Sequence, residues 1–216
     1  MINGVYGIVL CGGESKRMRR PKALLEVGGI PMLTRVCEAV SEVAEIVVVV
    51  SARGQGLPAL PSACRRVDDE QEQKGPLSGL STGIRTLGRS CGHTFVVGCD
   101  YPFLTGAYLR ALLGHSGEAD VTVAASDQPQ PLCAWYRTEC LVKASDLVES
   151  GEYRLQMILE GLSVSSVPVA DLGAWLPQHT TFNINTPEEH AQAEEMARLK
   201  MGEMRPSATD QRRNER

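Results

Sequence analysis

The sequence predicts a single α/β domain of three layers built on a mostly parallel β-sheet. Its 216 residues, 43% hydrophobic and 22% charged, have the usual size and composition of one globular domain. Short apolar runs, typical of buried strands, alternate along the chain with segments of helical periodicity. Glycine-rich and polar residues follow several of these runs directly, and ligands of such sheets bind at the ends of the strands.

The first half of the chain predicts a strand, a helix and a second strand. Residues 5–10 form an apolar run that stops at Gly12 and Gly13, as a buried strand does before a tight loop. A helix is expected from Pro31, a residue suited to a first helical position. Its apolar residues at helical spacing are Leu33, Val36, Cys37, Val40 and Ala44. The run 45–51 is rich in valine, which predicts a parallel strand buried on both faces.

The second half continues the alternation and closes with a capped helix. We expect strands at 94–98, 121–124 and 132–136, and helices at 105–113, near 139–149 and at 154–162. In the last helix Thr186 is the expected N-cap, Pro187 the first residue and Glu189 the partner in a capping box. The domain therefore spans 1–200, and the polar, aperiodic residues 201–216 are expected to form a disordered tail.

Composition excludes several classes of protein. A formal charge of −4 argues against binding nucleic acid by bulk electrostatics. No apolar segment is long enough to span a membrane, and the N-terminus lacks the pattern of a signal peptide, so we expect a cytoplasmic protein. The seven cysteines form no C-x-x-C pair and the four histidines have no metal-ligand spacing. These residues predict reduced thiols and no structural zinc.

A basic, glycine-containing loop follows the first strand. Gly12 and Gly13 allow backbone N–H groups to approach an anion closely. Five cations follow within seven residues, namely Lys16, Arg17, Arg19, Arg20 and Lys22. In a chain that is acidic overall, this local cluster predicts a triphosphate site, although it matches neither the P-loop nor the dinucleotide-binding pattern. The alternative interpretation is a solvated surface loop.

Two other strand ends carry carboxylates. Asp100 follows the strand at 94–98, and a carboxylate there can hold Mg²⁺ that is shared with substrate phosphates. The alternative is a turn or helix-capping role for this aspartate. Asp68 and Asp69 precede the segment 75–83, whose small residues allow a loop and a following helix to pack against a flat ligand.

The fourth polar segment precedes the last helix. Asn183 and Asn185 lie two apart on an extended segment, so we expect both side chains to point the same way. Amides both donate and accept hydrogen bonds, which suits a polar organic ligand. The alternative is that both asparagines only support the turn before the helix.

Taken together, these segments resemble a known family. The chain contains, in order, Leu-x-Gly-Gly-x-Ser-x-Arg-Met with a lysine soon after, Gly-Pro-Leu-x-Gly-Leu, Cys-Asp-x-Pro-Phe and Asn-x-Asn-Thr-Pro-Glu-Glu. This set resembles the molybdenum cofactor guanylyltransferases, which belong to the nucleotidyltransferases with a Rossmann-like sheet. The resemblance runs from about residue 5 to 198. It implies transfer of GMP from Mg-GTP to molybdenum-molybdopterin, with release of pyrophosphate.

The resemblance also implies roles for individual residues. It places Leu10, Gly12 and Gly13 along the nucleotide, and Arg17 and Lys22 at the phosphates. Ser51 and either Asp68 or Asp69 would lie at the guanine or ribose. Asp100 would lie at Mg²⁺, and Asn183 and Asn185 at the molybdopterin. Arg17, Lys22 and Asp100 would be the catalytic residues. The implied partners are the two substrates, with transient contact to cofactor-delivery proteins or client molybdoenzymes, and neither nucleic acid nor membrane.

Three positions depart from the family pattern and keep alternatives open. Pro21 before Lys22 resembles the cytidylyltransferase branch, while Ser51 and Cys11 stand where asparagine and alanine are usual. One alternative is therefore a cytidylyltransferase that acts on molybdopterin or on a sugar or polyol phosphate. The other is a non-catalytic nucleotide-binding chaperone for molybdoenzymes. An attacking substrate phosphate is already anionic at neutral pH, so the leading interpretation requires alignment and charge neutralisation rather than a protein nucleophile.

Overall fold

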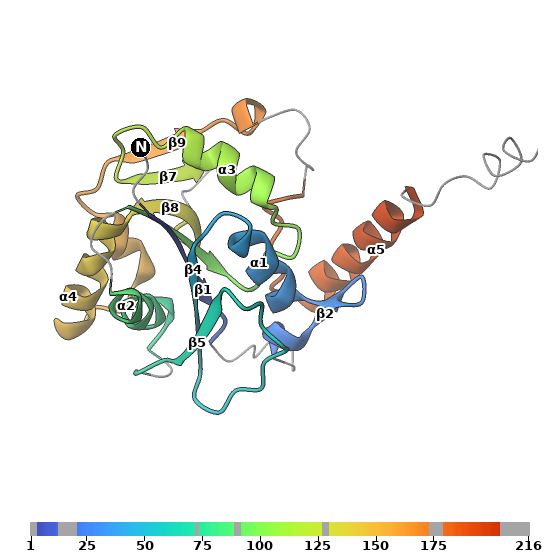
Figure 1. Cartoon of the computed structure of the whole chain (residues 1–216), viewed down its shortest axis with the longest axis horizontal. Coiled ribbons are helices and arrows are strands. Elements are labelled where there is room, and N and C mark those ends of the chain that lie inside the picture. Colours follow the sequence, from blue (N-terminus) through green and yellow to red (C-terminus); the bar gives the residue numbers. More distant parts are fainter. Residues whose placement is uncertain are drawn as a thin grey trace, which may run out of the picture.

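One central sheet organises the chain. The computed structural model describes residues 4–12, 21–71, 74–88, 92–126, 130–172 and 179–203. Among these residues, seven strands form a sheet in the order β5-β4-β1-β6-β8-β7-β9, with helices on both faces (Figure 1). The described part of the chain is thus the predicted three-layer α/β domain with a mostly parallel sheet.

The parallel half of the sheet supplies the edge at which a ligand can bind. Its strands are β1 (Val5–Leu10), β4 (Ile46–Ser51), β5 (Cys64–Asp68) and β6 (His93–Gly98). The other half contains β7 (Val121–Ala124), β8 (Cys133–Arg137) and β9 (Val164–Val167). β8 runs antiparallel to both β6 and β7, whereas β9 is parallel to β7. A separate hairpin joins β2 (Glu26–Val27) to β3 (Ile30–Pro31).

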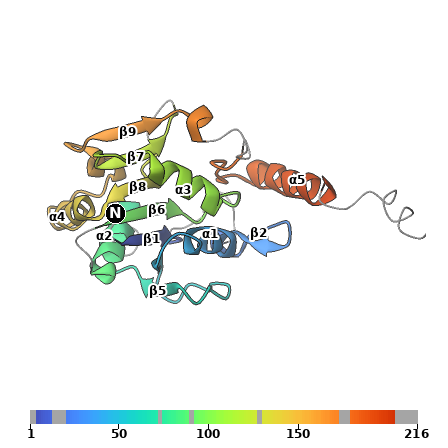
Figure 2. The same ribbon diagram turned by 45° about the horizontal axis from the view of Figure 1, so that its top comes forward.

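The helices cover the sheet in two layers (Figures 1 and 2). α1 (Met32–Ser41) and α3 (Gly106–Gly114) lie on one face, and α2 (Pro76–Leu87) and α4 (Lys143–Glu149) lie on the other. The last helix, α5 (Pro187–Glu203), projects away from the sheet and packs against the hairpin. Short 3₁₀ turns are η1 (Lys22–Leu24), η2 (Thr138–Val142), η3 (Leu155–Leu159) and η4 (Val169–Leu172).

The valine run of β4 shows why the core is double-sided. Val47 and Val49 face the cluster under α1 and α3, while Val48 and Val50 face the cluster under α2. Successive strand side chains point to opposite faces, so a strand covered on both sides must be apolar at every position. This is why the run lacks the polar alternation of a half-exposed strand.

A glycine brings α2 close to the sheet. A Cβ at Gly83 would lie 2.8 Å from Cγ2 of Ile8, and that contact leaves no room for a side chain. The close approach sets the position of the whole helix, including its first turn above the ends of β1 and β4. That first turn forms part of the candidate site.

Most predicted elements are confirmed, and several bounds change. Thr186 and Glu189 form the predicted capping box, with Glu189 N donating to Thr186 Oγ1 over 3.2 Å and Thr186 N donating to Glu189 Oε2 over 2.9 Å. Pro31 ends β3 instead of starting a helix, and the predicted helix at 154–162 is only the 3₁₀ turn η3.

Four strands were not predicted at all. They are β2, β3, β5 and β9, all short or only partly buried. The tail was expected at 201–216, but α5 continues to Glu203, so the first three of these residues are helical. Residues 204–216 lie outside the described residues. None of the described helices combines the length and the apolar character that a membrane crossing requires.

Candidate functional site

A cavity of about 250 Å³ opens where the parallel strands β1, β4 and β6 end. Cys11 N donates to Val50 O over 2.9 Å and Cys99 N donates to Leu10 O over 3.0 Å, so the three strands end at one level. The residues lining this cavity are Leu10, Cys11, Gly12, Lys22, Val50, Asp69, Gly75, Pro76, Gly79, Gly98, Cys99, Asp100 and Leu132. Five of the lining residues are glycine or proline, so much of the wall is backbone that a flat or extended ligand can approach closely.

The loops after β1 and β4 are tied together beneath the cavity. Gln55 accepts from Ala52 N over 3.1 Å and donates through Nε2 to Cys11 O over 3.0 Å. Gly12 packs directly on this junction, since a Cβ there would lie in van der Waals contact with Ala52 N at 3.4 Å. The glutamine thus fixes the backbone that leads into the basic loop.

Lys22 is the cation that the structure places in the cavity. Its Nζ lies 3.1 Å from Asp100 Oδ2 and donates to Asn185 Oδ1 over 2.8 Å. The side chains of Lys22 and Asp100 are 19% and 21% exposed, so the pair is accessible to a ligand but screened less than a surface pair. Three segments far apart in the sequence therefore meet at one ammonium group.

Asp100 is held against the end of β6. A Cβ on Gly98 would lie 2.4 Å from Asp100 Oδ1, so only glycine allows the carboxylate this position. Oδ2 contacts Lys22, while Oδ1 accepts no hydrogen bond from a described residue. The carboxylate therefore retains an oxygen that can coordinate a cation.

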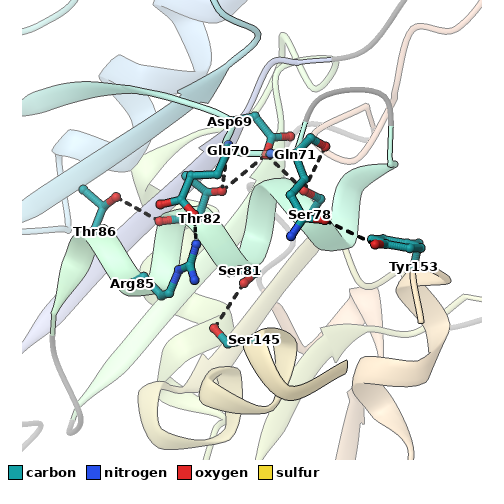
Figure 3. Close-up of polar contacts among 10 residues, drawn as sticks. All are labelled: Asp69, Glu70, Gln71, Ser78, Ser81, Thr82, Arg85, Thr86, Ser145 and Tyr153. Carbon is teal, nitrogen blue, oxygen red and sulfur yellow. Dashed lines mark hydrogen bonds and ion pairs between the residues drawn. The ribbon is translucent and has the colours of Figure 1, made fainter. Parts of the chain in front are cut away.

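Asp69 is oriented by the first turns of α2 (Figure 3). Its Oδ1 accepts from Ser78 Oγ over 3.0 Å, from Thr82 Oγ1 over 3.3 Å and from Gln71 N over 3.1 Å. Its Oδ2 accepts from none of the described residues, and Asp69 lines the cavity. The Ser78 hydroxyl also lies 3.1 Å from Gln71 O, so its single hydrogen is shared between two acceptors. Together these donors orient the carboxylate through one oxygen and leave the other oxygen for a ligand.

The same polar network anchors α2 to its surroundings (Figure 3). Ser81 donates to Ser145 of α4 over 3.1 Å, and Tyr153 donates to Gln71 over 3.2 Å. Arg85 forms an ion pair with Glu70. These contacts hold α2 between Asp69 and α4, so the position of Asp69 depends on packing across the helix layer.

Neither of the two described cysteines that line the cavity offers a thiolate as a nucleophile. Burial raises the pKa of Cys11 to about 12 and raises the pKa of Cys99 well above its ordinary value. Both thiols stay protonated at neutral pH, and protonated thiols are weak nucleophiles. The chemistry of the described site is therefore that of binding, alignment and charge neutralisation.

The structure brings some of the residues predicted from sequence together at the first cavity and places another at a second cavity. Leu10, Gly12, Lys22, Asp69 and Asp100 line the cavity, and Asn185 contacts it through Lys22. Asn183 instead lines a second cavity.

Of the other four predicted residues, two do not line the cavity and two fall outside the described residues. Ser51 is fully buried with an unpartnered hydroxyl, and Asp68 pairs with Arg66 over 3.2 Å; neither is among the lining residues. Gly13 and Arg17 fall outside the described residues. The predicted contacts of these four residues with a nucleotide stay predictions.

Sequence reasoning missed Gln55 and the tyrosines of the second cavity. Gln55 acts through backbone partners at residues 11 and 52, and no local pattern marks such a bridge. Tyr101 could have been found, because it lies within the strand-end motif next to Asp100. Tyr108 lies on a helix, where an apolar face and a binding residue follow the same spacing.

A divalent cation fits this site only with help from a ligand. The described residues contain no group of three or more histidine, cysteine or acidic side chains that could hold a metal ion by themselves. Asp100 offers one carboxylate oxygen. Mg²⁺ is commonly held by one or two carboxylates together with substrate phosphates and water, so a single carboxylate fits an ion that arrives with a phosphate chain.

Comparison with known proteins identifies related chains. Residues 7–167 match the MobA-like NTP transferase domain. The molybdenum cofactor guanylyltransferase of Desulfosudis oleivorans is 31% identical over 205 residues, which cover 93% of this chain and 98% of that protein. The protein of the same name from Ectopseudomonas mendocina is 30% identical over 189 residues, covering 86% and 90% of the two chains.

Solved structures show the same fold. Molybdopterin-guanine dinucleotide biosynthesis protein A from Archaeoglobus fulgidus superposes with a TM-score of 0.71 at 24% identity, covering 90% of this chain and 99% of that one. A 2-C-methyl-D-erythritol 4-phosphate cytidylyltransferase from Thermus thermophilus superposes with a TM-score of 0.63 at 17% identity, covering 89% and 98%. At these identities the likeness concerns the fold alone.

Proposed function

Because the chain belongs to the family of MobA-like NTP transferases, we propose that it is a molybdenum cofactor guanylyltransferase. It transfers GMP from GTP to the phosphate of molybdenum-molybdopterin. The phosphate oxygen of the acceptor forms a bond to the α-phosphorus of GTP, and the bond to the β-phosphate oxygen breaks. Pyrophosphate leaves with that electron pair. The observation that carries the proposal is the Lys22–Asp100 pair within a glycine-lined cavity at the ends of β1 and β6.

Lys22 serves the phosphate chain. Its ammonium lies where the strand ends meet, and developing charge on a transferred phosphoryl group is stabilised by fixed donors of this kind. Asp100 and Asn185 hold the ammonium in place through contacts of 3.1 and 2.8 Å. The lysine is therefore oriented before the substrate binds.

Asp100 would hold Mg²⁺ together with the phosphates. When bound, the ion neutralises phosphate charge and aligns the phosphate chain. The protein's contribution is the free Oδ1 beside Gly98 and the cation at Oδ2. The reaction requires a divalent cation, and we propose that this cation is magnesium.

Asp69 would select the base. Guanine presents two adjacent donors, N1–H and the N2 amino group, on one edge, and a carboxylate oxygen can accept from that edge. Asp69 offers such an oxygen because its other oxygen is saturated by three protein donors. Cytosine lacks this pair of donors, so Asp69 supports guanine over the cytidylyl alternative that Pro21-Lys22 suggests.

Product analysis tests the reaction. The protein is incubated with molybdopterin, Mg²⁺ and each of GTP, CTP, ATP and UTP in turn, and the dinucleotide is identified by mass. We expect the guanine dinucleotide from GTP, and its loss in Asp100→Asn with a melting temperature within a few degrees of the parent, because this variant also gives up the ion pair with Lys22. Formation of the cytosine dinucleotide alone would favour the cytidylyl alternative. Absence of all dinucleotides despite nucleotide binding would favour a chaperone.

A single substitution tests the base contact. In Asp69→Asn the three donors require an acceptor at Oδ1, so the amide nitrogen must take the place of Oδ2. GTP use should fall about ten- to a hundredfold, as for loss of a hydrogen bond to a charged group. XTP, which carries a carbonyl in place of the N2 amino group, should become the better substrate.

Asp68→Asn is the matched control for this test. Asp68 is the adjacent carboxylate, yet it pairs with Arg66 and does not line the cavity. It should keep the parental preference for GTP over XTP. An unchanged preference in Asp69→Asn, or an equal change in both variants, would remove Asp69 from base selection.

The remaining predictions concern the acceptor side of the site, the protein partners and the cellular location. Asn183 and Asn185 are proposed for the acceptor side because their segment adjoins Asp100, with Ile184 N donating to Asp100 O over 2.9 Å. Contact with cofactor-delivery proteins or client molybdoenzymes and a cytoplasmic location stay predictions.

A further inference from the structure

A second cavity lies beside the nucleotide site and has no assigned role. It measures about 190 Å³, and its walls include Tyr101, Tyr108, Gln130, Cys133, Thr181 and Asn183. It is smaller than the roughly 300–1,000 Å³ of an ordinary drug-sized site, so it suits a ring system better than a whole nucleotide. We call it the Tyr108 cavity.

Two chain segments connect the Tyr108 cavity to the nucleotide site. Asp100 lines the nucleotide site, while the next residue, Tyr101, lines the Tyr108 cavity. Likewise Asn185 binds Lys22, while Asn183 lines the Tyr108 cavity. The backbone bond from Ile184 N to Asp100 O joins the two segments. A ligand in the Tyr108 cavity is thus one residue away from the groups assigned to the phosphates.

Tyr108 provides an independent sign that the cavity has an occupant. The side chain comes from α3 and the residue is 2% exposed. Its buried hydroxyl has no hydrogen-bond partner of normal geometry among the described residues, and its neighbour is the thiol of Cys133, which is only a weak acceptor. Burial raises the pKa of Tyr108, with a further contribution from the neighbouring Cys133, so the phenol is neutral and able to donate at physiological pH. A buried hydroxyl with only a thiol as its neighbour is poorly satisfied, and a polar ligand would supply a stronger hydrogen bond.

The chemistry of the walls favours a neutral heterocycle. The described lining residues include no lysine, arginine, aspartate or glutamate. The side-chain amides of Gln130 and Asn183 make no hydrogen bond with another described residue, and each can donate and accept. An isolated phosphate would find no cation here, whereas a flat ring with alternating donors and acceptors on its edge would find matching groups.

We propose that the Tyr108 cavity binds the pterin ring system of the acceptor and that Tyr108 and Asn183 select it by hydrogen bonds to its polar edge. This inference rests on the proposed function, because only a pterin acceptor requires such a site. It adds Tyr108, Tyr101 and Gln130 to the acceptor side and separates the role of Asn183 from that of Asn185.

Direct binding of a free pterin tests the inference without the transfer reaction. The probe is neopterin, whose fluorescence reports binding to the full chain, and a fluorescent GTP analogue reports the nucleotide site in parallel. Tyr108→Phe removes only the hydroxyl, so neopterin affinity should fall about three- to tenfold, the usual range for one neutral hydrogen bond. Asn183→Ala should weaken neopterin binding at least as much. The affinity for the GTP analogue should stay within twofold in both variants.

Tyr136→Phe is the matched control for the loss of a buried hydroxyl. The Tyr136 hydroxyl donates to Pro131 O over 2.9 Å and belongs to the opposite side of the sheet. Tyr136→Phe should lower the melting temperature and leave neopterin binding unchanged. Tyr108→Phe should keep or raise the melting temperature, because its hydroxyl loses only a weak contact with the thiol of Cys133.

Several outcomes overturn the inference. The first is that the parent protein does not bind neopterin. The second is that Tyr108→Phe and Asn183→Ala bind neopterin with an affinity within twofold of the parent. The third is that guanosine displaces neopterin as well as unlabelled neopterin does. Failure of the proposed function gives a different result. In that case the parent forms no guanine dinucleotide, yet neopterin binding still depends on Tyr108. Conversely, normal dinucleotide synthesis with an unchanged KM for molybdopterin in Tyr108→Phe retains the function and refutes the pterin site.

Discussion

Replacing Lys22 with methionine separates catalytic from structural roles at the centre of the site. Methionine keeps the unbranched stem and removes the ammonium that contacts Asp100 at 3.1 Å and Asn185 at 2.8 Å. Because both members of the ion pair are only about one-fifth exposed, its contribution to the free energy of unfolding should be at or above the upper end for surface pairs, about 1–2 kcal/mol. For a domain of this size that corresponds to a loss of about 2–8 °C in melting temperature.

The expected effect on the reaction is much larger. A preorganised donor aimed at developing charge contributes about 2.7–4 kcal/mol to the transition state, which predicts a fall of about 100- to 1,000-fold in kcat/KM. Steady-state formation of the guanine dinucleotide gives the rate, and thermal unfolding gives the stability. The control is Arg66→Met, which breaks an ion pair of similar length, 3.2 Å, outside the cavity. It should change neither quantity appreciably.

A small kinetic effect would refute the assignment. A kcat/KM of Lys22→Met within threefold of the parent corresponds to less than about 1 kcal/mol. That result would mean that Lys22 only neutralises Asp100. A loss of melting temperature above about 10 °C would mean instead that the pair is mainly structural, and the kinetic loss would then follow from damage to the fold.

Three further predictions follow from the described residues. Among the cysteines that the structure describes, Cys64 should be alkylated first at neutral pH, because hydrogen bonds from Cys37 and then Ser41 lower its pKa to about 7. Peptide mass spectrometry after brief iodoacetamide treatment checks this, and uniform labelling of these cysteines would contradict it. Gly83→Ala should destabilise the protein by about 1–3 kcal/mol, because the added methyl group would overpack against the sheet. Gly114→Ala is the control and should not destabilise the protein, because the space around its Cβ position is open. Equal denaturation midpoints for the two variants would refute the packing argument. Truncation after Glu203 should leave melting temperature and activity unchanged, and a drop of several degrees would show that the tail docks.

The parallel core of the fold was predictable because its strands can be recognised from the local sequence alone. The run at β4 is continuously apolar, since a strand covered on both faces has no polar positions, and the sequence alone identifies it. β5 reads Cys-Arg-Arg-Val-Asp and was missed. It lies at the edge of the sheet and pairs only with β4, so its strand state depends on a partner distant in the sequence. No local pattern contains that information.

The sequence predicted that the site lies at the ends of the strands, but it did not predict which side chains reach the cavity. The rule that ligands bind there correctly gathers Leu10, Gly12 and Asp100 at one edge. It could not choose between Asp68 and Asp69, because the choice depends on where β5 stops. β5 ends at Asp68, whose side chain turns to Arg66, and the chain then bends so that Asp69 reaches the hydroxyls of α2. The decisive partners, Ser78 and Thr82, become neighbours only when α2 packs on the sheet.

The segment around Ile184 explains how one short stretch serves two neighbouring cavities. Ile184 is fully buried beneath α5 and the hairpin, and its N–H is bound to Asp100 O. A residue fixed on both sides holds its neighbours in register, so Asn185 stays on Lys22 while Asn183 stays on the Tyr108 cavity. The capping box of Thr186 and Glu189 extends this anchor, because Glu189 also accepts from Asn185 N over 2.6 Å. A helix cap, a buried isoleucine and two asparagines thus hold the proposed acceptor cavity next to the proposed phosphate site, and transfer between two bound ligands requires such fixed proximity.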